Sequence, residues 1–224
     1  GGFRGTSMRD AGIRLLSDQE CRERAKSIAE NRSGIFHLFR DNLVPVKDQN
    51  GHGYCWYYGA TSALEAARLI AGLPYVELSP HSGAARVKRG SDQGGWASEA
   101  LEDAEKGGVC PESLWPKHSR NYRLWSDPKI AEAAQEFRPL EWLDIPQGDM
   151  AALRSLLVSN FASGMGLMWW GHLVVFVAID WSDKHGWLYL MRNSHGPNFG
   201  NDGWIFLTES PARHGGGSAV RVAA

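Results

Sequence analysis

The sequence predicts an α+β fold, in which helices fill the first part of the chain and antiparallel strands fill the last part. Several segments between residues 17 and 160 have helical spacing with capping residues in front and glycines behind. From Met165 onward, short runs of β-branched and aromatic residues alternate with turn residues, which is typical of strands. The length of 224 residues is enough to bury a substantial core in one compact unit with two lobes.

Composition and charge exclude several functional classes. Apolar residues make up 43% and charged residues 22%, close to the globular average, so a disordered or fibrous chain is not expected. A formal net charge of −1 provides no field to hold a polyanion, and we expect no nucleic-acid partner. No apolar run has the length of a membrane helix and no signal peptide is visible, so we expect a soluble protein without membrane contact.

The cysteines indicate a chain that folds without disulfide staples. Cys21, Cys55 and Cys110 are an odd count, so at most one disulfide can form. This is compatible with a reducing compartment, although the sequence does not fix the localisation. Residues 1–7 precede Met8, and a non-native remnant and the cut end of a precursor both remain open.

The helices are predicted in order from their capping signals. Ser17 and Glu20 form a capping box for a helix over residues 17–30. Pro45 favours extended backbone before it, so residues 35–48 are predicted to be extended. A long helix begins at Cys55 and ends before Gly72. Shorter helices are predicted over residues 79–88, 96–106, 128–137 and 150–160.

The strand region contains four runs: MGLMWW, HLVVFVAIDW, GWLYLMRN and GWIFL. A turn at residues 183–186 joins the second and third runs into a hairpin, which would bring His172 beside Asn193. The GGGS motif at residues 215–218 is interpreted as a turn or flexible stretch.

Cys55 is the first candidate for chemistry, because it follows a glycine-rich loop at the first turn of a helix. The unpaired backbone N–H groups there stabilise a thiolate, which lowers the thiol pKa and makes it nucleophilic. A lone cysteine is more often buried and inert, so a base is also needed.

His172 is the candidate base, because it begins a strongly apolar strand where a buried imidazole is costly unless it is hydrogen-bonded. The hairpin would supply Asn193 as its partner. Five other histidines have polar or turn-like neighbours and are assigned to the surface: His37, His81, His118, His185 and His214.

At these residues the sequence resembles the papain family of cysteine peptidases. The resemblance extends over residues 35–207 in the family's order. Because several separated motifs match together, it is far more specific than any single short motif. The matching motifs are Gln49, Cys55 and Trp56 in VPVKDQNGHGYCW, Gly94-Gly95-Trp96, Gly171-His172 with LVV, and Asn193-Ser194-His195-Gly196 with Gly203-Trp204.

The resemblance implies a papain-like two-lobed fold, with a helical N-terminal lobe, an antiparallel β-barrel-like C-terminal lobe and the active-site cleft between them. Residues 1–34 would be an N-terminal extension. Residues 35–207 would be the peptidase domain, with the helical lobe at about 49–137 and the β lobe at about 138–207. Residues 208–224 would complete the β lobe.

The resemblance also implies a cysteine-type endopeptidase that acts on polypeptides without metal or organic cofactor. Cys55 and His172 would form a thiolate–imidazolium pair, with Asn193 orienting the histidine. Gln49 and the Cys55 backbone N–H would hold the oxyanion. The expected substrate-binding residues are Gly53, Gly94, Gly95, Gly171 and His195.

The chain departs from the family near the nucleophile. His52 and Asp92 stand at the places of the family's cystine, and both halves are lost together. His52-x-x-Cys55 has no second Cys/His pair at zinc-like spacing, so we expect no metal. Tyr54 replaces a residue that is small in the family.

Further departures concern the histidine. His195 replaces a tryptophan that shields the His–Asn hydrogen bond, so a more exposed and weaker bond is expected. Cys55 and His172 are 117 residues apart (172 − 55), against roughly 130–150 in the family. A loop that walls the cleft would be missing, which leaves the groove open or implies a wall from another chain.

Two alternative functions stay open. The chain could be a structural or binding component of a larger assembly or precursor, with vestigial activity. The same chemistry could also serve acyl transfer or the hydrolysis of a non-protein amide.

Overall fold

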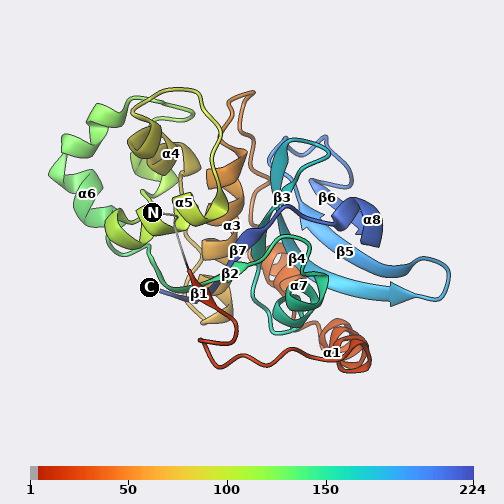
Figure 1. Cartoon of the computed structure of the whole chain (residues 1–224). Helices are drawn as coiled ribbons and strands as arrows, with labels where there is room; N and C mark the ends of the chain where they lie inside the picture. Colours follow the sequence, from red (N-terminus) through yellow and green to blue (C-terminus); the bar gives the residue numbers. More distant parts are fainter. Residues whose placement is uncertain (1–4) are drawn as a thin grey trace.

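The computed structural model describes residues 5–224. Most of residues 1–7, whose origin the sequence leaves open, therefore lie outside the described residues. A long central helix, α3 (Cys55–Ile70), lies between the remaining helices of its lobe and a seven-stranded sheet (Figure 1). Helices and strands are segregated in the way that the sequence predicts, and the α+β class is confirmed.

The capping signals place most helices correctly. At α1 (Asp18–Glu30), Ser17 accepts from the Glu20 N–H, and Glu20 accepts from the Ser17 N–H at 2.8 Å. The helices α4 (Pro80–Lys88), α5 (Ala97–Gly107), α6 (Pro128–Ala134) and α7 (Met150–Leu157) follow within the predicted ranges, give or take a residue. Short helical turns are found at η1 (Glu112–Leu114), η2 (Tyr122–Ser126) and α8 (Glu209–Ala212).

The prediction of extended backbone over residues 35–48 is wrong in its first half, where α2 (Ile35–Asp41) forms. Ile35 and Phe39 lie one helical turn apart and are both buried, so helix formation places two large apolar side chains on one face. Pro45 restricts only the residue directly before it, and α2 has ended by then.

The sheet has the order β1-β2-β7-β3-β4-β5-β6. Its strands are β1 (Thr6–Ser7), β2 (Pro139–Ile145), β3 (Ser163–Leu167), β4 (His172–Ser182), β5 (Gly186–Arg192), β6 (Trp204–Thr208) and β7 (Gly217–Ala223). Only the β1–β2 pair is parallel among the strand pairs of residues 5–224.

The interpretation of residues 215–218 as a turn or flexible stretch is wrong at its end, where β7 begins. Gly217 pairs with Ile145 of β2 and with Met165 of β3. A Cβ on Gly217 would lie 2.1 Å from the Gly164 carbonyl oxygen, so the glycine is needed for close approach of two strands. Gly217 therefore allows close strand pairing and is not part of a flexible segment.

Successive residues of β4 face opposite layers of the core. Leu173, Val175 and Val177 belong to the apolar cluster around α3, whereas Val174 and Phe176 belong to the cluster with α1 and α7. No helix within residues 5–224 is both long and apolar enough to cross a membrane.

Candidate active site

The hairpin of β4 and β5 brings His172 and Asn193 together as the sequence predicts. Ser182 pairs with Gly186 across the turn, and Val175 pairs with Arg192 at the other end. The Nε2 atom of His172 lies 2.7 Å from Oδ1 of Asn193. Because Oδ1 can only accept, Nε2 carries the proton and Nδ1 is left as the basic nitrogen of the neutral ring.

The His172–Asn193 bond is buried, so the expectation of an exposed bond is wrong. His172 is 8% exposed and Asn193 is 3% exposed. His195 stacks on His172 with ring centroids 4.5 Å apart, and Trp170 contacts the same ring edge-on at 4.7 Å. Trp170 comes from the short turn between β3 and β4, and its ring packs against the rings of both His172 and His195.

Burial also affects the acidity of this histidine. Desolvation lowers the pKa of His172, the bond to Asn193 opposes that shift, and the neighbouring His195 lowers the pKa further. The imidazole is therefore biased toward its neutral form, which is the form that acts as a base.

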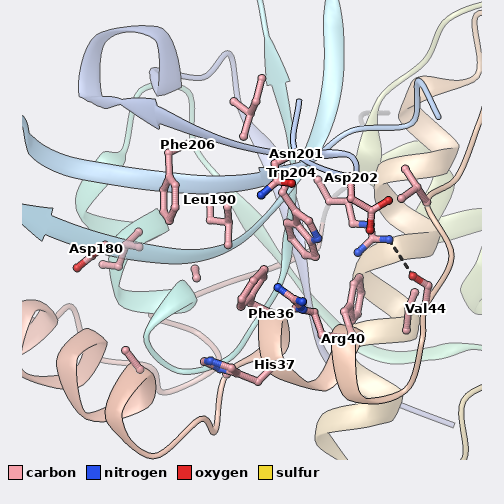
Figure 2. A pocket seen from close by; sticks show the side chains of 18 of the residues that line it. Phe36, His37, Arg40, Val44, Asp180, Leu190, Asn201, Asp202, Trp204 and Phe206 are labelled. Carbon is pink, nitrogen blue, oxygen red and sulfur yellow. Dashed lines mark hydrogen bonds between the residues drawn. The ribbon is translucent and has the colours of Figure 1, made fainter. Parts of the chain in front are cut away.

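Arg192 anchors the strand end that carries Asn193. It is buried, donates to the Val44 carbonyl at 2.8 Å and lies 4.5 Å from the Trp204 ring centroid. Figure 2 shows the bond to Val44 as a dashed line, in a hollow of about 1080 Å³ lined by parts of α1, α2, β4, β5 and β6. None of the predicted catalytic or substrate-binding residues lines that hollow.

Cys55 is the first residue of α3, and its thiol lies beside the start of β4. The backbone of Leu173, the residue after His172, lies close enough to the thiol to lower its pKa. One turn further along α3, a Cβ on Gly59 would lie 2.2 Å from the Leu173 side chain, so this glycine lets the helix approach the strand. The Cys55 thiol therefore lies beside the residue that directly follows His172 in β4.

The acidity of Cys55 differs from the sequence expectation. Burial raises its pKa above the ordinary 9.0, although the bonds from the Leu173, Trp56 and Cys55 backbone oppose that shift. The N-terminal position on α3 stabilises a thiolate, but desolvation dominates. With the histidine pKa lowered as well, the resting pair favours thiol and neutral imidazole.

Gln49 is held by Ser194, the residue after Asn193. The Gln49 N–H donates to the Ser194 carbonyl at 2.8 Å, and the Ser194 hydroxyl donates to Gln49 Oε1 at 2.6 Å. Gln49 Nε2 donates to the His52 carbonyl at 2.7 Å. An amide nitrogen has two hydrogens, so one N–H remains for another acceptor.

The predicted substrate-binding glycines lie on three loops: Gly53 before α3, Gly94 and Gly95 before α5, and Gly171 between β3 and β4. The Gly53 N–H donates to Asp92 Oδ1 at 2.6 Å, and a Cβ on Gly53 would lie 3.6 Å from the Gly94 nitrogen. A Cβ on Gly95 would collide with the Trp56 ring at 2.6 Å, whereas Gly94 and Gly171 face open space. Their role in substrate binding, like that of His195, stays a prediction.

Hydrogen bonds join the two segments at which the family has its cystine. All three cysteines, which lie within the described residues, are free thiols. Besides the Gly53–Asp92 bond, the buried Tyr54 donates its hydroxyl to the Ser91 carbonyl at 2.9 Å. Trp56 Nε1 donates to the Gln93 carbonyl at 3.1 Å. Hydrogen bonds therefore join the two segments that a disulfide joins in the family.

The assignment of His81 and His214 to the surface is wrong, because they are 1% and 2% exposed. His81 contacts His52 and Tyr58 behind the Gln49 loop, which local sequence could not reveal because these residues are distant in the chain. Within residues 5–224, no group of three or more His, Cys, Asp or Glu side chains is placed to hold a metal ion.

The chain is similar to known cysteine proteases, although no family model matches it. A cathepsin L-like peptidase of Aedes aegypti is 24% identical over 200 residues, covering 78% of this chain and 58% of that protein. A probable cysteine protease of Arabidopsis thaliana, RDL3, is 27% identical over 216 residues, covering 82% and 55%. The chain thus spans little more than half the length of these curated relatives.

Solved structures of proteases share the fold. Digestive procathepsin L 3 from the larval midgut of Tenebrio molitor has a TM-score of 0.66 at 19% identity, covering 83% of this chain and 68% of that one. The proform of the ragweed pollen allergen Amb a 11, a cysteine protease, has a TM-score of 0.68 at 22% identity, covering 83% and 65%.

Proposed function

We propose that this chain, a divergent member of the papain-like family with the papain-like two-lobed fold, is a cysteine endopeptidase. One observation carries the proposal: Nε2 of His172 lies 2.7 Å from Asn193 Oδ1, and the Cys55 thiol lies beside the backbone of the next residue, Leu173. A nucleophile, a base and a group that orients the base are the parts that thiol-dependent acyl transfer needs.

The pKa directions favour proton transfer during attack rather than a pre-formed ion pair. As the Cys55 sulfur bonds to the peptide carbonyl carbon, its proton passes to the free Nδ1 of His172. The carbonyl electron pair moves to oxygen, where the remaining Gln49 N–H and the Cys55 backbone N–H would donate. His172 then protonates the departing amine as the C–N bond breaks, and water hydrolyses the thioester with His172 again as base.

The decisive experiment is labelling with a thiol-directed epoxide peptide, followed by mass spectrometry, alongside hydrolysis of a mixed peptide library. We expect fast labelling of Cys55 that is lost in His172→Ala, and no hydrolysis by Cys55→Ala. Cys21 and Cys110 are buried and serve as internal controls. Slow, equal labelling of all three cysteines, or hydrolysis by Cys55→Ala, would refute the proposal. Fast labelling without hydrolysis of any peptide would favour the binding-component alternative.

A further inference from the structure

A chain of hydrogen bonds lies behind the loop that carries Gln49. Nε2 of His81 is 3.2 Å from Nδ1 of His52, and Nδ1 of His81 is 2.8 Å from the Tyr58 hydroxyl. Each end of the chain reaches a main-chain carbonyl: the Tyr58 hydroxyl lies 2.9 Å from Asp48 O, and His52 Nδ1 lies 3.2 Å from Gln49 O. The chain therefore spans two consecutive carbonyls of this loop.

The two carbonyls determine where the protons lie, because a carbonyl oxygen can only accept. Tyr58 must donate to Asp48, so it accepts from Nδ1–H of His81. His52 must carry its proton on Nδ1 to reach Gln49, so the same N–H also points to the unprotonated Nε2 of His81. Both ends thus require one tautomer of a neutral His81.

The surroundings keep His81 neutral. Burial is the main cause that lowers the pKa of His81 to about 3; the neighbouring His52, His118 and Arg120 act in the same direction, whereas Asp92 opposes them. His118 packs against His81, with ring centroids 5.2 Å apart, and its Nε2 lies 3.0 Å from Asp48 O. A protonated His81 would turn Nε2 from acceptor to donor and break the chain at His52.

These hydrogen bonds affect the position of the Gln49 side-chain amide, which is the proposed oxyanion donor. Gln49 lies within the segment from Asp48 to His52, and its side chain donates to the carbonyl of His52 itself. A shift of His52 therefore moves both the backbone of Gln49 and the acceptor that aims its Nε2. Ser194 fixes only the other side of the same amide.

We propose that His81, acting through His52 and Tyr58, is a positioning residue that holds Gln49 in place to stabilise the oxyanion. The inference rests on the proposed peptidase function and adds residues that contact neither the thiol nor the base. A displacement of about 1 Å in such a donor is enough to lower the rate of hydrolysis substantially.

The test compares two reactions of Cys55 in variants of the full chain. Peptide hydrolysis passes through an oxyanion, whereas alkylation by iodoacetamide does not. We expect His81→Phe to lower kcat/KM for hydrolysis by about tenfold while the alkylation rate changes less than about twofold. His81→Gln, whose amide oxygen can accept from His52, should retain more activity than His81→Asn, whose shorter amide reaches only toward Tyr58.

Three controls keep the result interpretable. His185→Asn changes an exposed histidine in the β4–β5 turn and should match the wild type. In a Gln49→Ala background, His81→Phe should cause no further loss, because the donor that it positions is gone. If thermal unfolding shows that His81→Phe does not fold, Tyr58→Phe and His52→Asn, which each remove one member of the chain, carry the same comparison.

The outcomes separate two kinds of failure. Equal losses of hydrolysis and alkylation, or full additivity with Gln49→Ala, would overturn the positioning role and leave the peptidase proposal standing. A wild-type chain that is alkylated at Cys55 yet hydrolyses no peptide would overturn both proposals.

Discussion

The two sides of the candidate site are built by different forces. On the strand side, His172 begins β4 and Asn193 directly follows β5, and the two strands are joined by a backbone ladder whose hydrogen bonds any side chain permits. On the loop side, the segment that carries Gln49 is held by individual buried polar side chains, including Lys47 and His81. The strand side should therefore tolerate substitutions outside the catalytic residues, whereas single changes behind the loop should disturb both stability and catalysis.

The strand side should give the largest effect when its base is removed. His172→Ala leaves the Cys55 thiol without a proton acceptor, and we expect kcat/KM for peptide hydrolysis to fall by about 10⁴-fold or more. The fold should survive, because the strand register does not need the imidazole. Steady-state kinetics and thermal unfolding check both expectations, and a loss below about tenfold would contradict the assignment of the base.

The loop side should give a smaller catalytic effect when its donor is removed. Gln49→Ala should lower kcat by about 10²–10³-fold, the usual consequence of losing one oxyanion donor. Alkylation of Cys55 should be unchanged, because it forms no oxyanion. Equal loss in both assays would indicate a general disturbance of the site instead.

The loop side also carries a stability prediction. Lys47 and Glu65 form an ion pair at 2.9 Å, with side chains only 6% and 1% exposed. Lys47→Met leaves a buried carboxylate unpaired and should lower the free energy of unfolding by about 3 kcal/mol, measured by urea denaturation. Because burial raises the pKa of Glu65, the folded state holds its proton more tightly, and the loss should grow as pH rises above the ordinary range of glutamate.

The matched control for this pair replaces both partners. In Lys47→Met with Glu65→Leu, no charge remains buried, so a large part of the lost stability should return. If the double variant loses as much stability as the two single variants added together, the charges do not act as a pair.

Trp170 tests how the strand side is shielded. Trp170→Ala opens the His172–Asn193 bond to water, which weakens it, and we expect about a tenfold loss in kcat/KM. Trp169→Ala is the matched control, because Trp169 is 62% exposed and contacts neither catalytic side chain in the described residues. Equal losses in the two variants would contradict a shielding role for Trp170.

The smallest effect concerns pH. Because burial raises the pKa of the Cys55 thiol, its alkylation rate should keep rising as the pH passes from neutral toward 9 and above. A pre-formed thiolate–imidazolium pair would instead give a plateau that begins in the acidic range. Rates of iodoacetamide alkylation between pH 5 and 10 distinguish the two cases, and a plateau would contradict the neutral resting pair.

The strand side was accessible from sequence because its pattern is local. Runs of β-branched and aromatic residues and a turn at residues 183–186 predict the β4–β5 hairpin, and the hairpin brings the strand ends that carry His172 and Asn193 together. The same reasoning placed α3 and its first residue, Cys55. Where a local signal misled, as at residues 35–41, burial of Ile35 and Phe39 decided the conformation.

The loop side was largely invisible in the sequence because its contacts join distant residues. The sequence around Pro80 does not indicate that His81 is buried against residues 52 and 58. The sequence likewise does not reveal the role of Trp170, because only the tight turn before His172 brings its ring against the imidazole. The direction of the Cys55 pKa shift also depends on tertiary burial, which outweighs the helix N-terminus that sequence can identify.

The adjacency of Asn193 and Ser194 has a mechanical consequence. Asn193 contacts the proposed base and Ser194 contacts the Gln49 amide, so two proposed functions are joined by a single peptide link. His172 and Asn193 both lie on the strand side, so a separation of the two sides would release the Gln49 amide and leave the His172–Asn193 bond in place. Moderate warming should therefore weaken the stabilisation of the oxyanion before it disturbs the proton acceptor.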